Sequence, residues 1–358
     1  MGYCRNILVL EPYFGGSHKF FLQQLAEHLD LNFILITLPA RKWKWRMRFA
    51  APWIAGQLGH KLDVEAVLCS TFVDVAALRG LAPAWFNRLP LLTYFHENQF
   101  AYPVQVQDER DFHFGLTNYL TALASDRLGF NSRFNLDTFL TGCRAMEKKA
   151  PDVRLDTTDR ISQKSTILPP GLNFSELDLL PDPQPPSCPV IVWNHRWEHD
   201  KNPELFFHTL FELADEGVPF KLIVVGQSFQ RSPALFAEIP GRLASRLIHF
   251  GYVADRTAYL QLLKQGTLII STAGHEFYGL SVLEAVRAGC RPFLPNRLSY
   301  PELFAPAYLY ENDQVFKERL RQVLLENHPP LSPSQRRALT AQGSWPVLQE
   351  QYEKWLTF

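Results

Sequence analysis

The chain has 358 residues, which is enough for two domains that each bury a core of their own. Hydrophobic residues make up 46% of the sequence and aromatic residues 13%, so the composition excludes an intrinsically disordered protein. The 36 Lys and Arg balance the 36 Asp and Glu, and any basic surface for nucleic acid or lipid therefore has to be local.

Five cysteines are scattered along the sequence without a CxxC pair: Cys4, Cys69, Cys143, Cys188 and Cys290. This odd, dispersed set argues against a disulfide framework or a zinc site and favours a reducing cytoplasm. No apolar run approaches the length of a membrane span, and the N-terminus lacks a signal-peptide pattern. We therefore expect a soluble cytoplasmic protein without stable membrane association, and nothing in the sequence indicates an obligate protein partner.

The first half of the sequence alternates short apolar runs with amphipathic segments, which predicts a parallel α/β domain. The runs predicted as strands are residues 7–10, 31–38, 64–68, 91–95 and 128–132. Gly15 and Gly16 follow the first run, and a helix with Ser17 as its N-cap follows them, but the GxGxxG spacing is absent. Two interpretations of this loop stay open: a simple turn, or a place where the backbone approaches a ligand phosphate.

A basic, aromatic run follows the second predicted strand, with five cations, two tryptophans and no acid. Its members are Arg41, Lys42, Trp43, Lys44, Trp45, Arg46 and Arg48. Such a run is commonly a solvated face, but indoles interleaved with cations also suit stacking on unpaired bases with the cations on phosphates. A membrane surface is a further alternative, although one short basic run on a neutral chain would bind lipid weakly.

Polar residues crowd the end of the run 91–95, where the sequence reads YFHENQFAYP (residues 94–103). Ligand sites of α/β proteins lie at the carboxyl ends of their strands. A lone histidine is more commonly structural than catalytic, but His96 occupies this position. We therefore take His96 as a candidate catalytic residue.

The second half repeats the α/β alternation after a proline-rich stretch, residues 181–189, that reads as a linker. Its predicted strands are residues 190–193, 220–225, 247–250 and 267–270. Arg196 and Lys201 lie in the polar loop after the first of them. They are either a solvated loop or a cationic pair for a phosphate group, in which Arg grips two oxygens and Lys acts as a point charge.

The stretch Gly274–Gly289, GHEFYGLSVLEAVRAG, predicts a glycine-containing loop between a buried strand and a helix. Such a loop places free backbone N–H groups and a positive helix end at the carboxyl edge of the sheet, where phosphates bind. Glu276 precedes the helix and Glu284 lies one turn inside it. Two surface glutamates are the plain alternative, but two acids beside a positive helix end favour a ligand with hydroxyls and phosphate, namely a nucleotide sugar.

Glu276 and Glu284, with seven residues between them, resemble the E-x7-E motif of retaining glycosyltransferases of family 4, which have the GT-B fold. The resemblance implies an α/β protein with two Rossmann-like parallel-sheet domains, residues 1–175 and 176–340, and a C-terminal helix, residues 341–358, that returns to the first domain. Residues 167–172 would be the strand into the hinge. It further implies a metal-independent enzyme without a cofactor, in which Glu276 and His96 lie at the reacting sugar. The residues implied to bind the donor are Gly15, Gly16, Arg196, Lys201, Gly279, Leu280, Ser281 and Glu284.

Three stretches of the first half, GGSHK, LPARKWKWRMR and YFHENQFAYP, are similar to a narrower family, the tRNA-queuosine α-mannosyltransferases. That resemblance implies GDP-mannose as the donor and the queuosine base in the anticodon of tRNA-Asp as the acceptor. The basic, aromatic run would then belong to the tRNA-binding surface.

Two alternatives stay open on the sequence. One is a family 4 enzyme that builds a lipid-linked or envelope glycan from another nucleotide sugar, with the segment 43–54 as its membrane-docking surface. The other is an inactive GT-B relative that binds RNA, against which the presence of all the implied site residues argues. The residues themselves do not distinguish guanine from uracil or mannose from its epimers.

Overall fold

The computed structural model describes residues 5–102, 112–149, 152, 155–227 and 233–357, so Cys4 and Pro103 lie outside the described residues. The chain forms two compact units. The first consists of Met1–Leu172 together with Trp345–Phe358, and the second of Asn173–Ser344.

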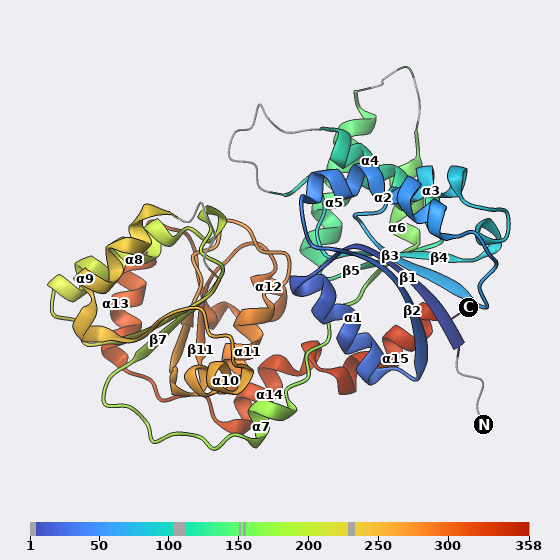
Figure 1. Cartoon of the computed structure of the whole chain (residues 1–358). Coiled ribbons are helices and arrows are strands. Elements are labelled where there is room, and N and C mark those ends of the chain that lie inside the picture. Colours follow the sequence, from blue (N-terminus) through green and yellow to red (C-terminus); the bar gives the residue numbers. More distant parts are fainter. Residues whose placement is uncertain (1–4, 103–111, 150–151, 153–154, 228–232, 358) are drawn as a thin grey trace. The chain divides into compact units, whose positions relative to one another are not determined.

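The first unit contains a six-stranded parallel sheet in the order β2-β1-β3-β4-β5-β6 (Figure 1). Its strands are β1 (Arg5–Phe14), β2 (Leu31–Pro39), β3 (Ala66–Ser70), β4 (Leu91–Phe95), β5 (Arg127–Phe130) and β6 (Ser165–Ile167). The central strands are buried on both faces, which explains why they read as continuous apolar runs. The strand order reverses between β1 and β3, and ligands of such sheets bind beside that point.

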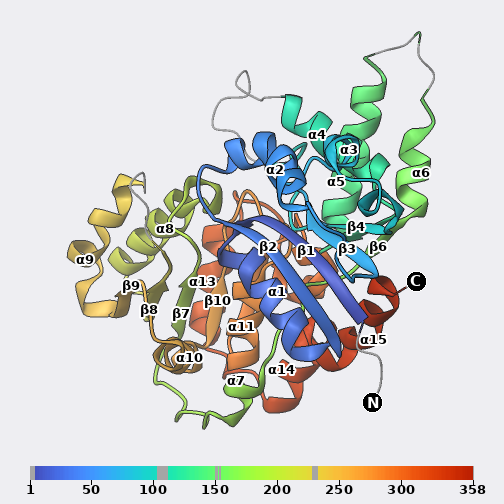
Figure 2. The same cartoon turned by 45° about the vertical axis from the view of Figure 1, so that its right-hand side comes forward.

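Helices cover both faces of this sheet. They are α1 (Gly16–His28), α2 (Trp43–Gln57), α3 (Val75–Leu81), η1 (Phe86–Arg88), α4 (Phe112–Ala124), α5 (Arg133–Glu147), α6 (Thr157–Gln163) and α15 (Trp345–Leu356). Helices α1 and α15 lie side by side over one face, as Figures 1 and 2 both show, and share a core with β1, β3 and β4. Helices α2 and α3 pack on the opposite face.

Helix α15 confirms the prediction that the C-terminal helix returns to the first domain. Its apolar face is buried, and the Trp345 Nε1–H donates to Gln24 Oε1 on α1 over 2.9 Å. The Tyr352 hydroxyl donates to the Pro169 carbonyl over 2.9 Å. The strand expected over 167–172 ends at Ile167, because Pro169 and Pro170 have no N–H for a ladder, and the free carbonyls there serve α15 instead.

The second unit contains another six-stranded parallel sheet, in the order β12-β11-β10-β7-β8-β9. Its strands are β7 (Val190–Asn194), β8 (Lys221–Val225), β9 (Leu247–Gly251), β10 (Leu268–Ile270), β11 (Arg291–Pro295) and β12 (Leu309–Tyr310). Counted from β7, this is the 3-2-1-4-5-6 order of dinucleotide-binding folds. The switch point lies between β7 and β10, which pair directly at Ile191 and Leu268.

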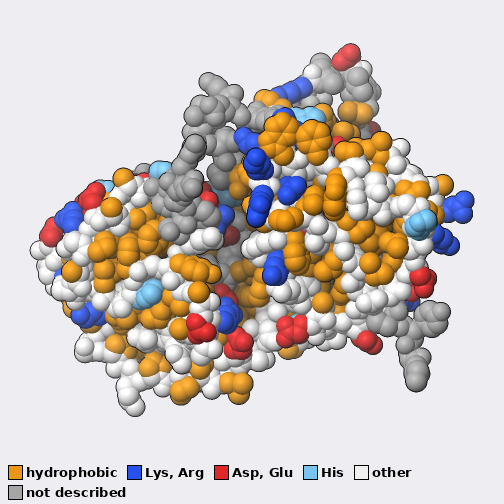
Figure 3. Space-filling view, in the orientation of Figure 1, with side chains coloured by type: hydrophobic (Ala, Val, Ile, Leu, Met, Phe, Trp, Pro, Cys, Tyr) orange, Lys and Arg blue, Asp and Glu red, His pale blue; other side chains and the backbone are white. Residues whose placement is uncertain are grey.

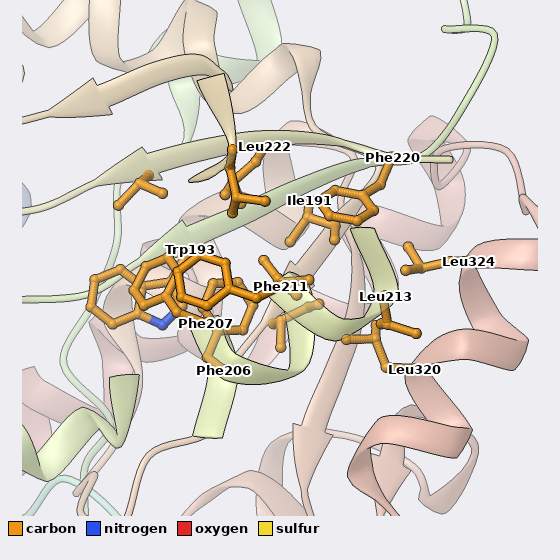
Figure 4. Packing of buried hydrophobic residues seen from close by; sticks show 14 of the residues in the cluster. Ile191, Trp193, Phe206, Phe207, Phe211, Leu213, Phe220, Leu222, Leu320 and Leu324 are labelled. Atoms are coloured by element: carbon orange, nitrogen blue, oxygen red, sulfur yellow. The ribbon is translucent and has the colours of Figure 1, made fainter. Parts of the chain in front are cut away.

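The helices of the second unit also form two layers. They are α7 (Ser175–Leu179), η3 (His199–Lys201), α8 (Pro203–Asp215), η4 (Ala234–Ala237), α9 (Ile239–Arg242), η5 (Ala244–Arg246), α10 (Arg256–Gln265), α11 (Leu280–Ala288), α12 (Tyr300–Leu303), η6 (Pro306–Tyr308), α13 (Phe316–Glu326), α14 (Pro333–Thr340) and η7 (Ala341–Gly343). Aromatic residues fill the layer between the sheet and α8, where Trp193 of β7 packs on Phe206 and Phe207 (Figure 4). Two Rossmann-like parallel sheets confirm the predicted fold class.

The proline-rich stretch 181–189 lies inside the second unit and is tied to it by Asp182. The Asp182 carboxylate accepts from Lys264 Nζ over 2.7 Å and from both Arg336 Nη atoms over 2.7 and 2.9 Å. Hydrogen bonds from Arg336 are the main reason that the pKa of Asp182 falls to about 2. The segment is therefore irregular in backbone but anchored.

The longest helices among the described residues, α2 and α5, have 15 residues each, and no described helix is long and apolar enough to cross a membrane.

Candidate functional site

The candidate donor site of the second unit lies at the switch point of its sheet. The loop after β7 carries Arg196 and Lys201, and the loop after β10 carries Glu276. Backbone hydrogen bonds join the two loops, because Gly274 N–H donates to the Asp200 carbonyl over 2.8 Å. The sheet order thus brings together residues that are about 80 positions apart in the sequence.

Lys201 is the buried cation of this site. Its Nζ donates to the His275 carbonyl over 2.7 Å and lies 3.1 Å from Asp200 Oδ2 and 3.4 Å from Glu276 Oε2. Burial alone would lower the pKa of Lys201, but Glu276 and Asp200 outweigh it and raise the pKa. Lys201 is therefore a fixed positive charge whose first partners are carboxylates of the protein.

Glu276 is the carboxylate opposite Lys201, and 20% of its side chain is exposed. Burial by itself would raise the pKa of Glu276, but the charge of Lys201 outweighs it and lowers the pKa, so the group is ionised. His195 and His275 lie beside it, and burial lowers the pKa of each to about 4. Glu276 therefore presents a negative charge among neutral histidines.

Arg196 occupies a different environment from Lys201. About half of its side chain is exposed, and its Nη2 lies 3.0 Å from Glu198 Oε2. Because an exposed ion pair contributes little, this contact leaves the guanidinium able to exchange Glu198 for a phosphate group. The two cations predicted as a phosphate-binding pair thus differ in burial and in partners.

Glu284 lies on α11 and is held by two residues of α10. Arg256 Nη2 lies 2.6 Å from Glu284 Oε1, and the Tyr259 hydroxyl donates to Glu284 Oε2 over 2.9 Å. Asn194, at the end of β7, donates from Nδ2 to the Tyr259 hydroxyl over 2.8 Å and to the Ser281 carbonyl over 3.1 Å.

Arg256 and Tyr259 were not predicted as site residues. They are three positions apart on α10, so they share one helix face, and that spacing is the only signal the sequence offers. What makes them partners of Glu284 is the packing of α10 beside α11, which becomes visible only in the fold.

Gly279 is the N-cap of α11, and Leu280 and Ser281 form the first helical turn. The backbone of Gly279 has φ 102°, which an L side chain adopts only with strain. The turn directs the backbone of the helix start toward the same edge of the sheet as Glu276. This is the arrangement that favours binding of an anionic group at a helix end.

In the first unit, Gly15 and Gly16 join β1 to α1. The helix begins at Gly16 with Gly15 as N-cap, so the prediction of Ser17 as the cap is wrong. A Cβ on Gly15 would meet Ala40 Cβ at 2.5 Å, so close packing on the end of β2 explains that glycine. Gly16 has φ 50°, a left-handed conformation that glycine adopts without strain.

His96 follows β4 and belongs to a cluster with Glu11 of β1 and His18 of α1. The rings of His96 and His18 have centroids 4.0 Å apart. His18 Nδ1 lies 2.9 Å from Glu11 Oε2, and His18 Nε2 lies 3.5 Å from Glu97 Oε2. His18, Glu11 and Glu97 were not predicted as site residues, because only the order of strands in the sheet makes them neighbours of His96.

Glu11, His18 and His96 place possible metal-ligand atoms within 4.8 Å of one another, the one such group among the described residues. Both ring nitrogens of His18 already face carboxylates, and Glu11 Oε1 accepts the Tyr13 N–H over 2.8 Å. A metal needs a free lone pair on each ligand, which this arrangement of His18 does not offer. The cluster fits an ion-pair network better than a metal centre.

The basic, aromatic run leads into α2, which begins at Trp43 with Lys42 as its N-cap and was not predicted as a helix. Trp43 points inward, with its ring centroid 5.2 Å from Phe114. Trp45 points outward, is 56% exposed and stacks on Phe49, which is 57% exposed, at 5.6 Å. The two indoles therefore have different environments, one packed and one on the surface.

The cations of this segment surround the exposed pair. Arg41, Lys42, Lys44 and Arg48 are exposed, and Arg46 is half-buried with its Nη2 donating to the Pro39 carbonyl over 3.2 Å. The Arg48 guanidinium lies over the Trp45 ring at 5.8 Å. Figure 3 shows Lys and Arg side chains gathered beside exposed hydrophobic ones where Figure 1 draws α2.

The two doubly wound sheets, each with a glycine-containing loop and charged side chains at its switch point, have the GT-B fold. Solved structures agree on the fold. Sucrose-phosphate synthase from Thermosynechococcus elongatus has a TM-score of 0.65 at 13% identity, with 98% of each chain covered. The Anabaena HepE protein in complex with UDP has a TM-score of 0.62 at 12% identity, also with 98% of each chain covered.

Sequence comparison identifies the family within this class. Residues 6–172 match the family model described as tRNA-queuosine alpha-mannosyltransferase N-terminal. The tRNA-queuosine alpha-mannosyltransferase of Drosophila melanogaster is 35% identical over 325 residues, covering 88% of this chain and 86% of the relative. The chain belongs to the tRNA-queuosine alpha-mannosyltransferase family.

Proposed function

We propose that the protein transfers mannose from GDP-mannose to the queuosine base in the anticodon of tRNA-Asp, with retention of configuration at the sugar. The observation that carries this proposal is the 35% identity to the Drosophila enzyme across most of both chains. The carboxylates and cations at the switch point of the second unit support it, because they suit a nucleotide sugar.

The donor is assigned to the second unit. Glu284, oriented by Arg256 and Tyr259, would accept hydrogen bonds from the ribose hydroxyls, and the start of α11 at Gly279, Leu280 and Ser281 would receive the diphosphate. Arg196 would exchange Glu198 for a phosphate oxygen. Lys201 would act chiefly by holding Glu276 in place.

The transfer itself needs charge stabilisation at two points. The departing diphosphate gains negative charge, which Arg196 and the helix end can stabilise without a metal. The sugar ring gains positive charge, which the ionised Glu276 can stabilise. Glu276 is therefore proposed as an electrostatic group and not as a covalent nucleophile, and His96 is proposed, by resemblance to the family, to contact the sugar.

We assign tRNA binding to the first unit, at the exposed start of α2. The charged residues in the first turn of this helix are cations and none is acidic, so the helix dipole adds to their positive charge instead of offsetting it. Cations at the positive end of the helix lower the stability of the unbound protein. They favour the binding of a polyanion. Trp45 and Phe49 add a stacking surface for an unpaired anticodon-loop base.

One assay tests the proposal. The protein is incubated with radiolabelled GDP-mannose and with tRNA that contains or lacks queuosine, and label in the tRNA is measured. We expect transfer to the queuosine-containing tRNA alone. Equal labelling of both tRNAs would contradict the proposed acceptor. Labelling from UDP-glucose in place of GDP-mannose would contradict the proposed donor.

A further inference from the structure

The proposed function gives no role to Glu11 and His18, which are clustered with His96. Glu11 and His18 are buried, at 2% and 4% exposure. A neutral imidazole carries one N–H and so can donate to one carboxylate only, whereas both nitrogens of His18 face carboxylates. This geometry favours an imidazolium at His18, with its positive charge between the carboxylates of Glu11 and Glu97.

The His96 ring lies against the ring of His18. Its ring lies 4.0 Å from that of His18 and meets Phe21 and Tyr94 edge-on at 4.9 and 4.7 Å. Its backbone carbonyl accepts from Asn131 Nδ2 over 2.7 Å. Within the described part of the chain, neither ring nitrogen of His96 has a hydrogen-bond partner, and the residue is partly exposed.

We infer that Glu11 and His18 form a positioning pair for His96: they fix the plane of its ring and place a positive charge behind it. His96 then serves as a neutral hydrogen-bonding group toward the sugar and does not accept a proton during transfer. The inference rests on the proposed function for the identity of the ligand. It adds two positioning residues, Glu11 and His18, that touch no substrate themselves.

The pKa shifts of the two histidines agree with a charged His18 and a neutral His96. Burial alone would lower the pKa of His18, but Glu11 and Glu97 outweigh it and raise the pKa to about 10. Burial, and then the His18 charge, hold the pKa of His96 well below its ordinary value. A neutral imidazole donating to a substrate oxygen is an established way of stabilising developing charge. The titratable groups around the cluster are Glu11, Tyr13, His18, Cys69, Tyr94, Glu97 and Tyr352.

The test is an NMR titration of the whole protein labelled in its 11 histidines. The His96 signal is assigned from its loss in His96→Gln. In the wild type we expect no titration of His96 between pH 5 and 8. In His18→Gln the His96 pKa should rise by at least about one unit toward the ordinary value near 6.5, because the facing charge is gone. His60→Gln, at an exposed site, is the matched control and should leave His96 unchanged.

Titration of wild-type His96 near its ordinary pKa, or an unchanged His96 in folded His18→Gln, overturns the inference. If His18→Gln does not fold, Glu97→Gln provides the second arm. In this variant the pKa of His18 itself should fall, because one of its two carboxylate partners is neutral. An unchanged His18 pKa overturns the inference. The NMR titrations use no acceptor. Failure of the tRNA assay is therefore distinguishable from failure of the positioning role inferred for Glu11 and His18.

Activity supplies an independent readout. The acid limb of the kcat profile should lie at higher pH in His18→Gln than in the wild type, because His96 is protonated more easily without the facing charge, while the KM for donor changes less than kcat. A merely structural role for His18 would lower activity equally at every pH. Parallel pH profiles for the wild type and the variant therefore contradict the inference.

Discussion

Lys201 Nζ lies 3.4 Å from Glu276 Oε2, so the buried cation of the donor site is already neutralised by the protein itself. Asp200 provides a second carboxylate at 3.1 Å. Arg196 is half-exposed, with its Nη2 3.0 Å from Glu198 Oε2, and we propose it as the cation that contacts the ligand. This difference separates the roles of two residues that the sequence presented as a pair.

The first prediction follows from that difference. Lys201→Ala leaves Glu276 and Asp200 buried without their cation, so we expect a loss of about 3–5 kcal/mol in the free energy of unfolding together with lost activity. Arg196→Ala should unfold like the wild type but bind GDP about 2 kcal/mol more weakly. Urea unfolding and calorimetric titration with GDP measure the two effects. Arg242→Ala, at an exposed ion pair, is the control, and equal stability of both site variants would refute the assignment.

The two glutamates should affect different kinetic constants. Glu276→Gln removes a charge that matters most when positive charge develops at the sugar, so kcat should fall far more than nucleotide affinity. Glu284→Ala removes the proposed ribose acceptor and should mainly raise the donor KM. Steady-state kinetics with GDP-mannose distinguish these patterns, and the same pattern in both variants means that the roles are wrongly divided.

Activity is expected without a divalent metal, because the proposed leaving-group stabilisation comes from Arg196 and the start of α11. Transfer should proceed at an unchanged rate in excess EDTA after extensive dialysis. An absolute need for added magnesium or manganese would contradict this expectation.

Helix α2 offers a pair of tryptophans with opposite expected effects. Trp45→Ala removes an exposed ring and should weaken tRNA binding by about 1–3 kcal/mol with little change in stability. Trp43→Ala removes a ring packed on Phe72 and Phe114 and should lower the free energy of unfolding by about 2–4 kcal/mol. Thermal melts beside tRNA binding curves measure both. Full tRNA affinity in folded Trp45→Ala would exclude this residue from the acceptor surface.

The five cations of the same segment should control the salt dependence of binding. Neutralising Arg41, Lys42, Lys44, Arg46 and Arg48 removes phosphate contacts, so tRNA affinity should fall by orders of magnitude and vary less with salt. Donor binding, measured with GDP, should be unchanged. Undiminished tRNA affinity in this folded variant ends the assignment of the surface.

Stability should decline on both sides of about pH 6.5. The pKa of His18 is about 10 in the folded protein, above the unfolded value of 6.5, so its stabilisation is complete below pH 6.5 and is lost as the pH rises to 10. The pKa of His195 and of His275 is about 4, so their contribution is present above pH 6.5 and is lost as the pH falls to 4.

Urea unfolding at pH 5, 6.5, 8 and 9.5 measures this dependence. His18→Gln should remove most of the decline on the alkaline side, on the order of 3 kcal/mol, and leave the acid side unchanged. A variant whose stability still falls like that of the wild type above pH 6.5 would show that His18 is not the group responsible.

The fold was largely readable from the sequence because buried parallel strands appear as continuous apolar runs. The strands that escaped prediction have physical reasons. Strand β11 contains Pro292 and Pro295, which disfavour a strand, and β12 has only two residues. Helix α2 lacks an apolar period at its start, so its cations and tryptophans gave no helical signal.

The sequence predicted those residues of the candidate site that belong to a single short motif. Glu276 and Glu284 share a short stretch, and their spacing could be noticed directly. Their partners come from other elements: Lys201 from the loop after β7, and Arg256 from α10. No local pattern predicts such pairs, because the order of strands in the sheet decides which loops meet.

Helix α15 follows the entire second unit in the sequence yet completes the core of the first, where Trp345, Tyr352 and Trp355 pack with Phe21 and Tyr94. During synthesis the first sheet is therefore made early and stays unfinished while the second unit emerges from the ribosome. Its face beneath α15 is exposed for that whole interval, so the nascent chain presents aromatic surface to chaperones. Folding of the first unit thus depends on a segment translated after the second, and the two units cannot be produced as independent pieces by a single cut between them.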